Sequence, residues 1–130
     1  MQSYRRLPVW KKAHAIALSV DALTRRIPRG RHGGLVTQLQ RASLSIPANI
    51  AEGTSRATDK DLANFLQTAL ASATEVEYHL EFAADASIIS RKEFEQLQSQ
   101  LIEVRRMLAG FIKYLRHANQ RRRKSPAPAA

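Results

Sequence analysis

The sequence of 130 residues contains no cysteine. This absence excludes disulfide frameworks, thiolate zinc sites and cysteine nucleophiles together, and it agrees with a reducing compartment. No apolar run approaches the roughly 18 residues that span a bilayer, and the first residues, MQSYRRLPVWKK, lack the apolar core of a signal peptide. The sequence therefore predicts a cytoplasmic protein with no membrane association.

Residue patterns typical of catalytic or metal sites are also lacking. The Glu-x-x-His pairs of di-iron bundles and the His-Glu-x-x-His motif are absent. Glu75 and His79, four positions apart, are typical of a helix-surface contact. The segment PRGRHGGL, residues 28–35, lacks the Gly-Lys-Ser/Thr ending of a P-loop and is predicted to be a turn. Ser43 and Ser45 have no histidine nearby in the sequence to act as a base. We expect no catalytic residue, no metal, no cofactor and no enzymatic activity.

Positive charge is what the sequence has in abundance, with 21 Lys and Arg against 11 Asp and Glu, a net charge of +10. Residues 1–33 carry eight basic residues and one acid, whereas residues 58–90 carry six acids and one lysine. The hydrophobic content of 44% is typical of a folded chain. We expect one domain over residues 1–118, followed by a basic, disordered tail over residues 119–130.

Hydrophobic periodicity predicts four helices and no strand. Apolar residues recur at alternating spacings of three and four between Leu62 and Ala83 and again between Phe94 and Leu115. Thr58 is the expected N-cap of the third helix, and Ser90 with Glu93 forms a capping box for the fourth. The expected helices are residues 8–27, 34–53, 58–86 and 91–117. Four helices with short connections predict an all-α, antiparallel up-down four-helix bundle.

A proline stands at the centre of the second expected helix. Pro47 lacks a backbone donor and its ring clashes with the carbonyl four residues earlier, and the apolar pattern changes phase at this position. We therefore predict a helix bent at Pro47, with Ser43 or Ser45 satisfying the carbonyls left unpaired and Gly53 ending the helix. Two short helices, with Ser45 capping the second, are the alternative.

Apolar residues outside the expected core positions predict self-association, although scattered exposed apolar residues also occur in monomers. The second helix should be the most enclosed, because Arg41 and Glu52 are the only charged residues between positions 35 and 52. Glu52 would then bond to Asn49 or pair with Arg41, unless both charges reach solvent. The displaced apolar residues are Leu18, Phe65, Leu70, Tyr78, Phe82, Ile102 and Ile112.

Basic residues on outward helix faces are candidates for nucleic-acid binding. A solvated charged face would explain such residues in a neutral protein, but a net charge of +10 favours a polyanion bound electrostatically, with little sequence preference. Tyr4, Trp10 and Tyr114 lie near these charges and are candidates for base stacking, although Trp10 also suits the core. A structural or protein-interaction scaffold without a nucleic-acid role is the alternative. The candidate residues are Arg5, Arg6, Lys11, Lys12, Arg25, Arg26, Arg29, Arg31, Arg106, Lys113 and Arg116.

The segment LVTQLQRASLSIPANIAEGTSRATDKDLANFLQTALASATEVEYHL, preceded by LPVWKKAHAIALSV, resembles a bacterial four-helix-bundle family. That family includes ribosomal RNA intervening-sequence proteins and the accessory variability determinant of diversity-generating retroelements. The resemblance extends over roughly residues 7–115. The motif positions, which we interpret as structural or assembly residues, are Arg41, Pro47, Asn49, Glu52, Gly53 and Arg56.

This resemblance implies a homopentameric barrel of four-helix bundles without assigned catalytic residues. It also implies that the retroelement members bind DNA or RNA through a basic surface and associate with a reverse transcriptase. The motif is shared by both kinds of member and does not separate them. In such an assembly, the bend at Pro47 would let the second helix line both its own bundle and that of a neighbour.

Overall fold

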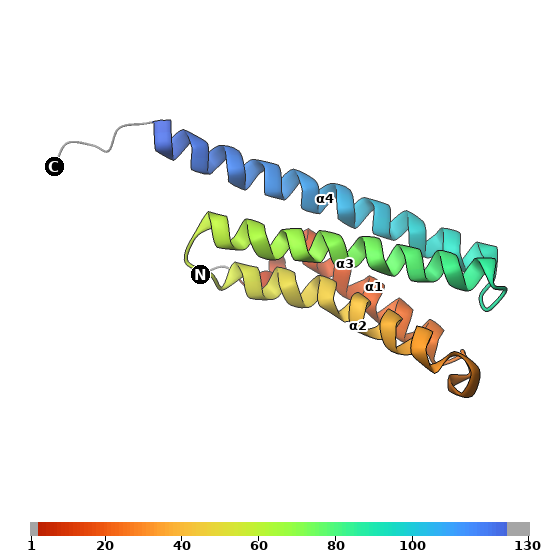
Figure 1. Cartoon of the computed structure of the whole chain (residues 1–130). Helices are drawn as coiled ribbons and strands as arrows, with labels where there is room; N and C mark the ends of the chain where they lie inside the picture. Colours follow the sequence, from red (N-terminus) through yellow and green to blue (C-terminus); the bar gives the residue numbers. More distant parts are fainter. Residues whose placement is uncertain (1–2, 125–130) are drawn as a thin grey trace.

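The computed structural model describes residues 3–124, which form four α-helices and no strand (Figure 1). A short 3-10 turn precedes the first helix, and short connections join the helices to one another. This all-helical architecture agrees with the expected four-helix bundle. The elements are η1 (Tyr4–Arg6), α1 (Pro8–Thr24), α2 (Arg29–Thr54), α3 (Asp59–Asp85) and α4 (Arg91–Lys124).

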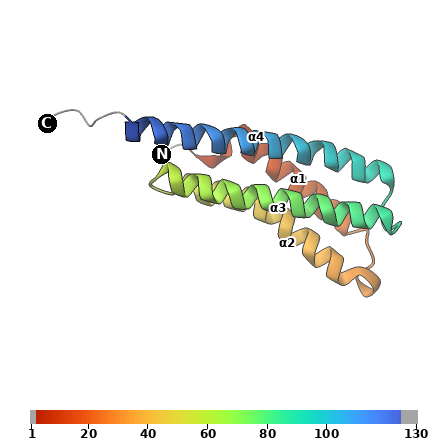
Figure 2. The same ribbon diagram turned by 45° about the horizontal axis from the view of Figure 1, so that its top comes forward.

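Each helix packs on the helix that follows it, and α1 also packs on α4 (Figure 1, Figure 2). The diagonal pairs, α1 with α3 and α2 with α4, make no close backbone approach within the described residues. The four helices therefore surround one shared hydrophobic core.

The core includes most of the apolar positions that the periodicity identified on α3 and α4, although Leu62 and Phe111 are only half-buried. On α3, the residues from Leu66 to Ala83 that continue the three-and-four spacing are buried, and on α4 the same holds from Phe94 to Leu108. Burying a large aliphatic side chain stabilises a fold by about 1.5–3 kcal/mol. Ile112 was expected outside the core but is buried. The helical repeat of 3.6 residues drifts from a 3.5-residue pattern, so the buried face rotates toward Ile112 near the end of α4.

Both predicted helix caps are confirmed. The Thr58 hydroxyl accepts a hydrogen bond from the backbone N–H of Asp61 at 3.1 Å. At the start of α4, the Ser90 hydroxyl accepts from the Glu93 N–H at 3.0 Å, and the Glu93 carboxylate accepts from the Ser90 N–H at 2.9 Å. These bonds satisfy donors that the first turn of a helix leaves unpaired.

Three helix boundaries differ from the prediction by more than one residue. α1 ends at Thr24 rather than at 27, and α2 begins at Arg29 rather than at 34, so most of PRGRHGGL is helical instead of a turn. His32, with φ −130° and ψ 29°, interrupts this first part of α2. α4 continues to Lys124 instead of ending at 117, which makes part of the expected disordered tail helical. The rest of that tail, residues 125–130, lies outside the described residues.

α2 continues without a break through Pro47, so the alternative of two short helices is wrong. Inside α2 the departure from helical φ/ψ lies at His32 and not at Pro47. The Ser43 hydroxyl donates to the Gln40 carbonyl at 3.2 Å and not to the carbonyl of Ser43 itself, which the proline leaves without its usual donor. The bend at Pro47 stays a prediction.

Gly53 does not end α2 in a left-handed conformation, because no described glycine has a positive φ and the helix continues to Thr54. Its role is steric. A Cβ atom placed on Gly53 would lie 2.9 Å from Leu62 Cδ1 and 2.9 Å from Phe65 Cβ. The missing side chain therefore allows the last turn of α2 to approach the first turns of α3.

Candidate nucleic-acid interface

All eleven basic residues predicted to bind nucleic acid are exposed to solvent. They lie on η1, on α1 and the connection that follows it, on the first turn of α2, and on α4 from Arg106 onward. Exposure is the first requirement for contact with a phosphate backbone. These residues differ, however, in what each side chain already contacts.

Three of the predicted cations are already paired with carboxylates. Lys12 contacts Glu103 at 3.1 Å and Arg25 contacts Asp21 at 2.8 Å. Arg26 pairs with Glu93 across the interface of α1 and α4. A cation whose charge is balanced by a neighbouring carboxylate attracts a phosphate less strongly, so these three are weaker candidates.

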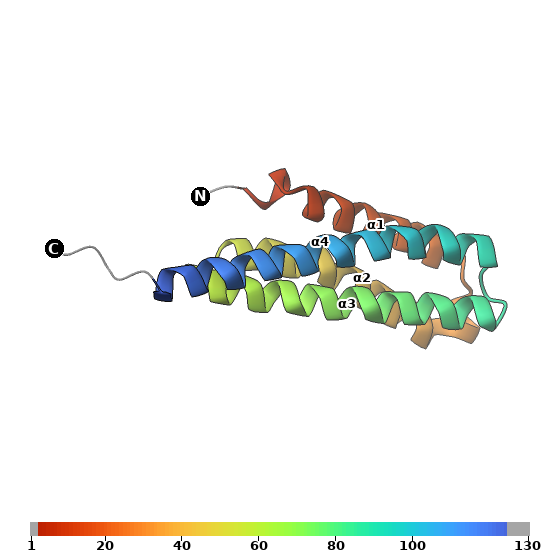
Figure 3. The same cartoon turned by 90° about the horizontal axis from the view of Figure 1, so that it is seen from above.

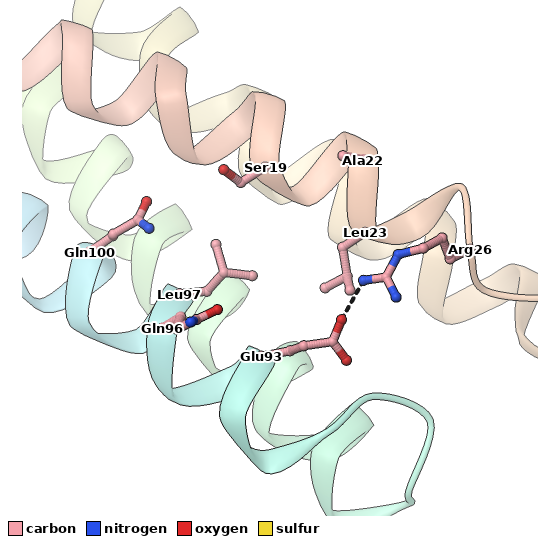
Figure 4. A pocket seen from close by; sticks show the side chains of 8 residues that line it. All are labelled: Ser19, Ala22, Leu23, Arg26, Glu93, Gln96, Leu97 and Gln100. Carbon is pink, nitrogen blue, oxygen red and sulfur yellow. Dashed lines mark hydrogen bonds and ion pairs between the residues drawn. The ribbon is translucent and has the colours of Figure 1, made fainter.

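Figure 4 shows the Arg26–Glu93 pair at the mouth of a pocket between α1 and α4. The pocket has a volume of about 270 Å³, and Ser19, Gln96 and Gln100 provide its uncharged polar groups. The bond from Arg26 and the hydrogen bond from the Ser90 backbone together lower the pKa of the Glu93 carboxyl below its ordinary value. This carboxylate is therefore charged at neutral pH, which holds Arg26 in its place.

Within the described residues 3–124, six of the predicted cations form no ion pair, side-chain hydrogen bond or ring contact: Arg6, Lys11, Arg31, Arg106, Lys113 and Arg116. Of the other two, Arg29 donates to the side-chain oxygen of Gln40 at 3.3 Å. Arg5 lies over the Tyr4 ring at 4.7 Å. The six unpaired basic residues are the groups best able to contact phosphates.

The fold places five of these six residues toward the two ends of the bundle and Arg106 near the middle of α4, instead of gathering them in one patch. The start of α1 and the end of α4 lie at the same end (Figure 1, Figure 3). Arg6, Lys11, Lys113 and Arg116 therefore belong to this end, whereas the basic residues 25–31 follow α1 at the opposite end. A polyanion that contacts both groups would have to run along the bundle.

The end of α4 protrudes beyond the neighbouring helices (Figure 1, Figure 3). This extension carries the basic run at 121–124, which the sequence analysis assigned to a disordered tail. The sequence did indicate a helix here. The segment HANQRRRK contains neither proline nor glycine, and Ala, Gln, Arg and Lys are good helix formers. The extension adds positive charge next to Lys113 and Arg116 along the chain.

Of the six motif residues, three are buried or half-buried and three are exposed. Pro47 and Gly53 are buried. Asn49 donates from Nδ2 to the Ser45 carbonyl at 2.8 Å, and the Ser45 hydroxyl lies 2.8 Å from the hydroxyl of Ser72 on α3. These bonds connect the two helices near the proline.

The predicted partners of Glu52 are wrong. Glu52 pairs with Arg56 at 2.7 Å, one turn further along, and not with Arg41 or Asn49. Both Glu52 and Arg41 are exposed, which agrees with the alternative that they reach solvent. Arg56 also lies 4.6 Å from the centre of the Phe65 ring. An exposed pair of this kind stabilises a helix only weakly.

Most of the displaced apolar residues are indeed on the surface. Leu18, Tyr78, Phe82 and Ile102 are exposed, and Phe65 and Leu70 are half-buried. Leu44 is also exposed, which was not predicted, because α2 was expected to be the most enclosed helix. Trp10 is half-buried and stacks on His14, with ring centres 4.8 Å apart.

No group of three metal-binding side chains occurs among the described residues. Glu75 and His79 contact each other at 3.3 Å across one turn of α3, as their spacing predicted. In the part of the chain that the structure describes, none of the helices has the length and apolar character needed to cross a membrane.

Comparison with known proteins agrees with this architecture. The family model of the 23S rRNA-intervening sequence protein matches residues 5–110. A search of curated proteins gives no match. The crystal structure of a protein with unknown function, from the S23 ribosomal protein family of Bacteroides thetaiotaomicron VPI-5482, is 28% identical to this chain with a TM-score of 0.74. The similarity covers 81% of this chain and 98% of that one. The chain thus belongs to the 23S rRNA-intervening sequence protein family.

Proposed function

We propose that this chain is a non-enzymatic protein that binds DNA or RNA through exposed basic side chains. The observation that carries the proposal is the set of six unpaired basic residues on a chain of net charge +10. Lysine and arginine side chains that neutralise phosphates release condensed counterions, and this release drives binding without regard to base sequence. The proposed activity is therefore strong, salt-dependent association with little sequence preference.

The bundle is proposed to be antiparallel and up-down, bent at Pro47, and assembled as a homopentameric barrel. Support for assembly comes from two separate apolar surfaces. Leu18 and Leu44 are exposed beside a pocket of about 280 Å³ between α1 and α2, and Tyr78 and Phe82 are exposed on α3. A contact between two different surfaces is head-to-tail, and such contacts form a ring when the rotation closes. A ring would multiply the phosphate contacts of one chain.

In the cytoplasm, the partner of such an assembly is proposed to be a reverse transcriptase of a diversity-generating retroelement. The support is the motif shared with the accessory variability determinants of such elements, carried here by Arg41, Pro47, Asn49, Glu52, Gly53 and Arg56. A gene for a reverse transcriptase beside a repeated variable region would support this role. An open reading frame inside a ribosomal RNA gene would oppose it.

Filter binding tests the proposed activity. The purified full chain is incubated with labelled duplex DNA, single-stranded RNA and an RNA:DNA hybrid at about 50 and about 200 mM salt. We expect retention at the lower salt concentration and a steep loss at the higher one. Absence of retention at about 50 mM salt, or retention that salt does not change, would refute electrostatic binding and leave the scaffold role.

A further inference from the structure

A second hollow on the molecule lies between α3 and α4, near the end of the bundle where α4 protrudes. It has a volume of about 360 Å³, within the range of small-ligand sites. Leu70 and Ile112 provide an apolar floor, and Lys113, Arg116, His117 and Gln67 provide polar groups around it. We call this hollow the α3–α4 groove. An adjoining hollow of about 250 Å³ shares Arg116 and extends the groove along the first turns of α3.

The α3–α4 groove is positively charged and has no carboxylate in its lining. Within the described residues, Lys113 and Arg116 form no ion pair, in contrast to Arg26 beside its pocket on the other side of α4. Asp59 is a carboxylate of the adjoining hollow, where Lys60 also lies. The free cations of the groove are therefore available to an anionic ligand.

An aromatic side chain accompanies these cations along α4. Tyr114 is 63% exposed and is not among the residues that line the groove. It follows Lys113 directly and lies three positions before His117, so Tyr114 stands beside His117 on the outer face of α4 and not on the face that carries Arg116. Exposed aromatic rings beside basic residues are the features with which proteins bind single strands, because each unpaired base presents a flat face for stacking.

We propose that a single-stranded nucleic acid crosses this part of α4, with phosphates on Lys113 and Arg116 in the α3–α4 groove and a base stacked on Tyr114 outside it. This inference rests on the proposed function and specifies the form of nucleic acid that is bound. The Gln67 amide offers a donor and an acceptor to a base edge. A duplex hides the faces of its bases, so it would use only the cations and would lose the contribution of the tyrosine.

The test compares two substitutions of Tyr114, whose side chain is 63% exposed. Tyr114→Phe keeps a flat aromatic ring at this position and is the matched control. Tyr114→Leu removes the ring, keeps the charge and favours the helix. Fluorescence anisotropy then measures the affinity of wild type and both variants for single-stranded RNA, single-stranded DNA and duplex DNA of one length.

Tyr114→Leu is expected to weaken binding of single strands by about 5- to 150-fold and to leave duplex binding nearly unchanged, whereas Tyr114→Phe, which keeps the stacking ring, leaves both nearly unchanged. The two single strands, compared with each other, show whether a ribose hydroxyl is recognised. Equal effects of the two variants, or tighter binding of duplex than of single strands by wild type, would overturn the inference while the proposed function stands. Failure of wild type to bind any of the three probes would overturn both.

Discussion

The close approach of α2 and α3 at Gly53 leads to a quantitative prediction about stability. In Gly53→Ala, the added methyl group would lie 2.9 Å from both Leu62 Cδ1 and Phe65 Cβ. Leu62 Cδ1 belongs to the end of a flexible side chain and is able to rotate away. Phe65 Cβ is fixed to the backbone, so the two helices must move apart.

Overpacking of this kind costs about 1–3 kcal/mol, because neighbouring side chains and backbone leave their preferred positions. Alanine recovers part of this cost, since it is better than glycine inside a helix by about 0.5–1 kcal/mol. We therefore expect Gly53→Ala to lower the free energy of unfolding by about 1–2 kcal/mol.

Gly110→Ala on α4 is the matched control, because a Cβ atom at Gly110 has no neighbour within 4 Å. This variant should gain the helix preference alone and raise the free energy of unfolding by about 0.5–1 kcal/mol. Urea unfolding followed by far-ultraviolet circular dichroism, at one fixed protein concentration, measures both variants. If Gly53→Ala stabilises the fold as much as Gly110→Ala does, the steric account of Gly53 is wrong.

Three further predictions concern local contacts. Thr58→Ala removes the acceptor of the Asp61 N–H and should lower the free energy of unfolding by about 1 kcal/mol; an unchanged urea midpoint would contradict the cap. Pro47→Ala should retain the helical circular dichroism signal and alter the mass of the assembly, so an unchanged mass by light scattering would count against a role of the bend in assembly. The pKa of Glu93 is lowered from 4.5 by Arg26 and the Ser90 backbone, so its stabilising effect is full above pH 4.5 and is lost as the pH falls through the lower folded value. The difference in unfolding free energy between wild type and Glu93→Gln should accordingly shrink over this acid range. A difference independent of pH would refute the stabilising effect of the ionised Glu93 carboxylate.

The fold followed from the sequence where a local rule was sufficient. Spacings of three and four placed the buried faces of α3 and α4, and short polar signals at Thr58 and Ser90 marked where these helices begin. Both rules depend only on residues a few positions apart. Helix ends were predicted less well, because the glycines of PRGRHGGL suggested a turn where α2 already begins, and the basic run at 121–124 suggested a tail where α4 continues.

The candidate interface was predicted in part. Exposure of the eleven basic residues followed from their positions on the helix faces. Which of them are neutralised did not follow, because the Arg26–Glu93 and Lys12–Glu103 pairs join residues of different helices that are far apart in the sequence. The α3–α4 groove was not predicted either, because its lining comes from two helices. The spacing of residues within each helix does not fix how far one helix is shifted along the other. The helical extension of α4 was missed although its composition favoured a helix.

The most direct test of the central claim is the salt dependence of affinity for a single-stranded oligonucleotide. The logarithm of the binding constant is measured against the logarithm of salt concentration for wild type and for the double variant Lys113→Gln, Arg116→Gln. Each phosphate contact contributes a slope of about −0.7, so the variant should show weaker binding and a slope shallower by about 1.4. Parallel lines for the two proteins would show that these cations are merely solvated, and a flat line for wild type would contradict electrostatic binding altogether.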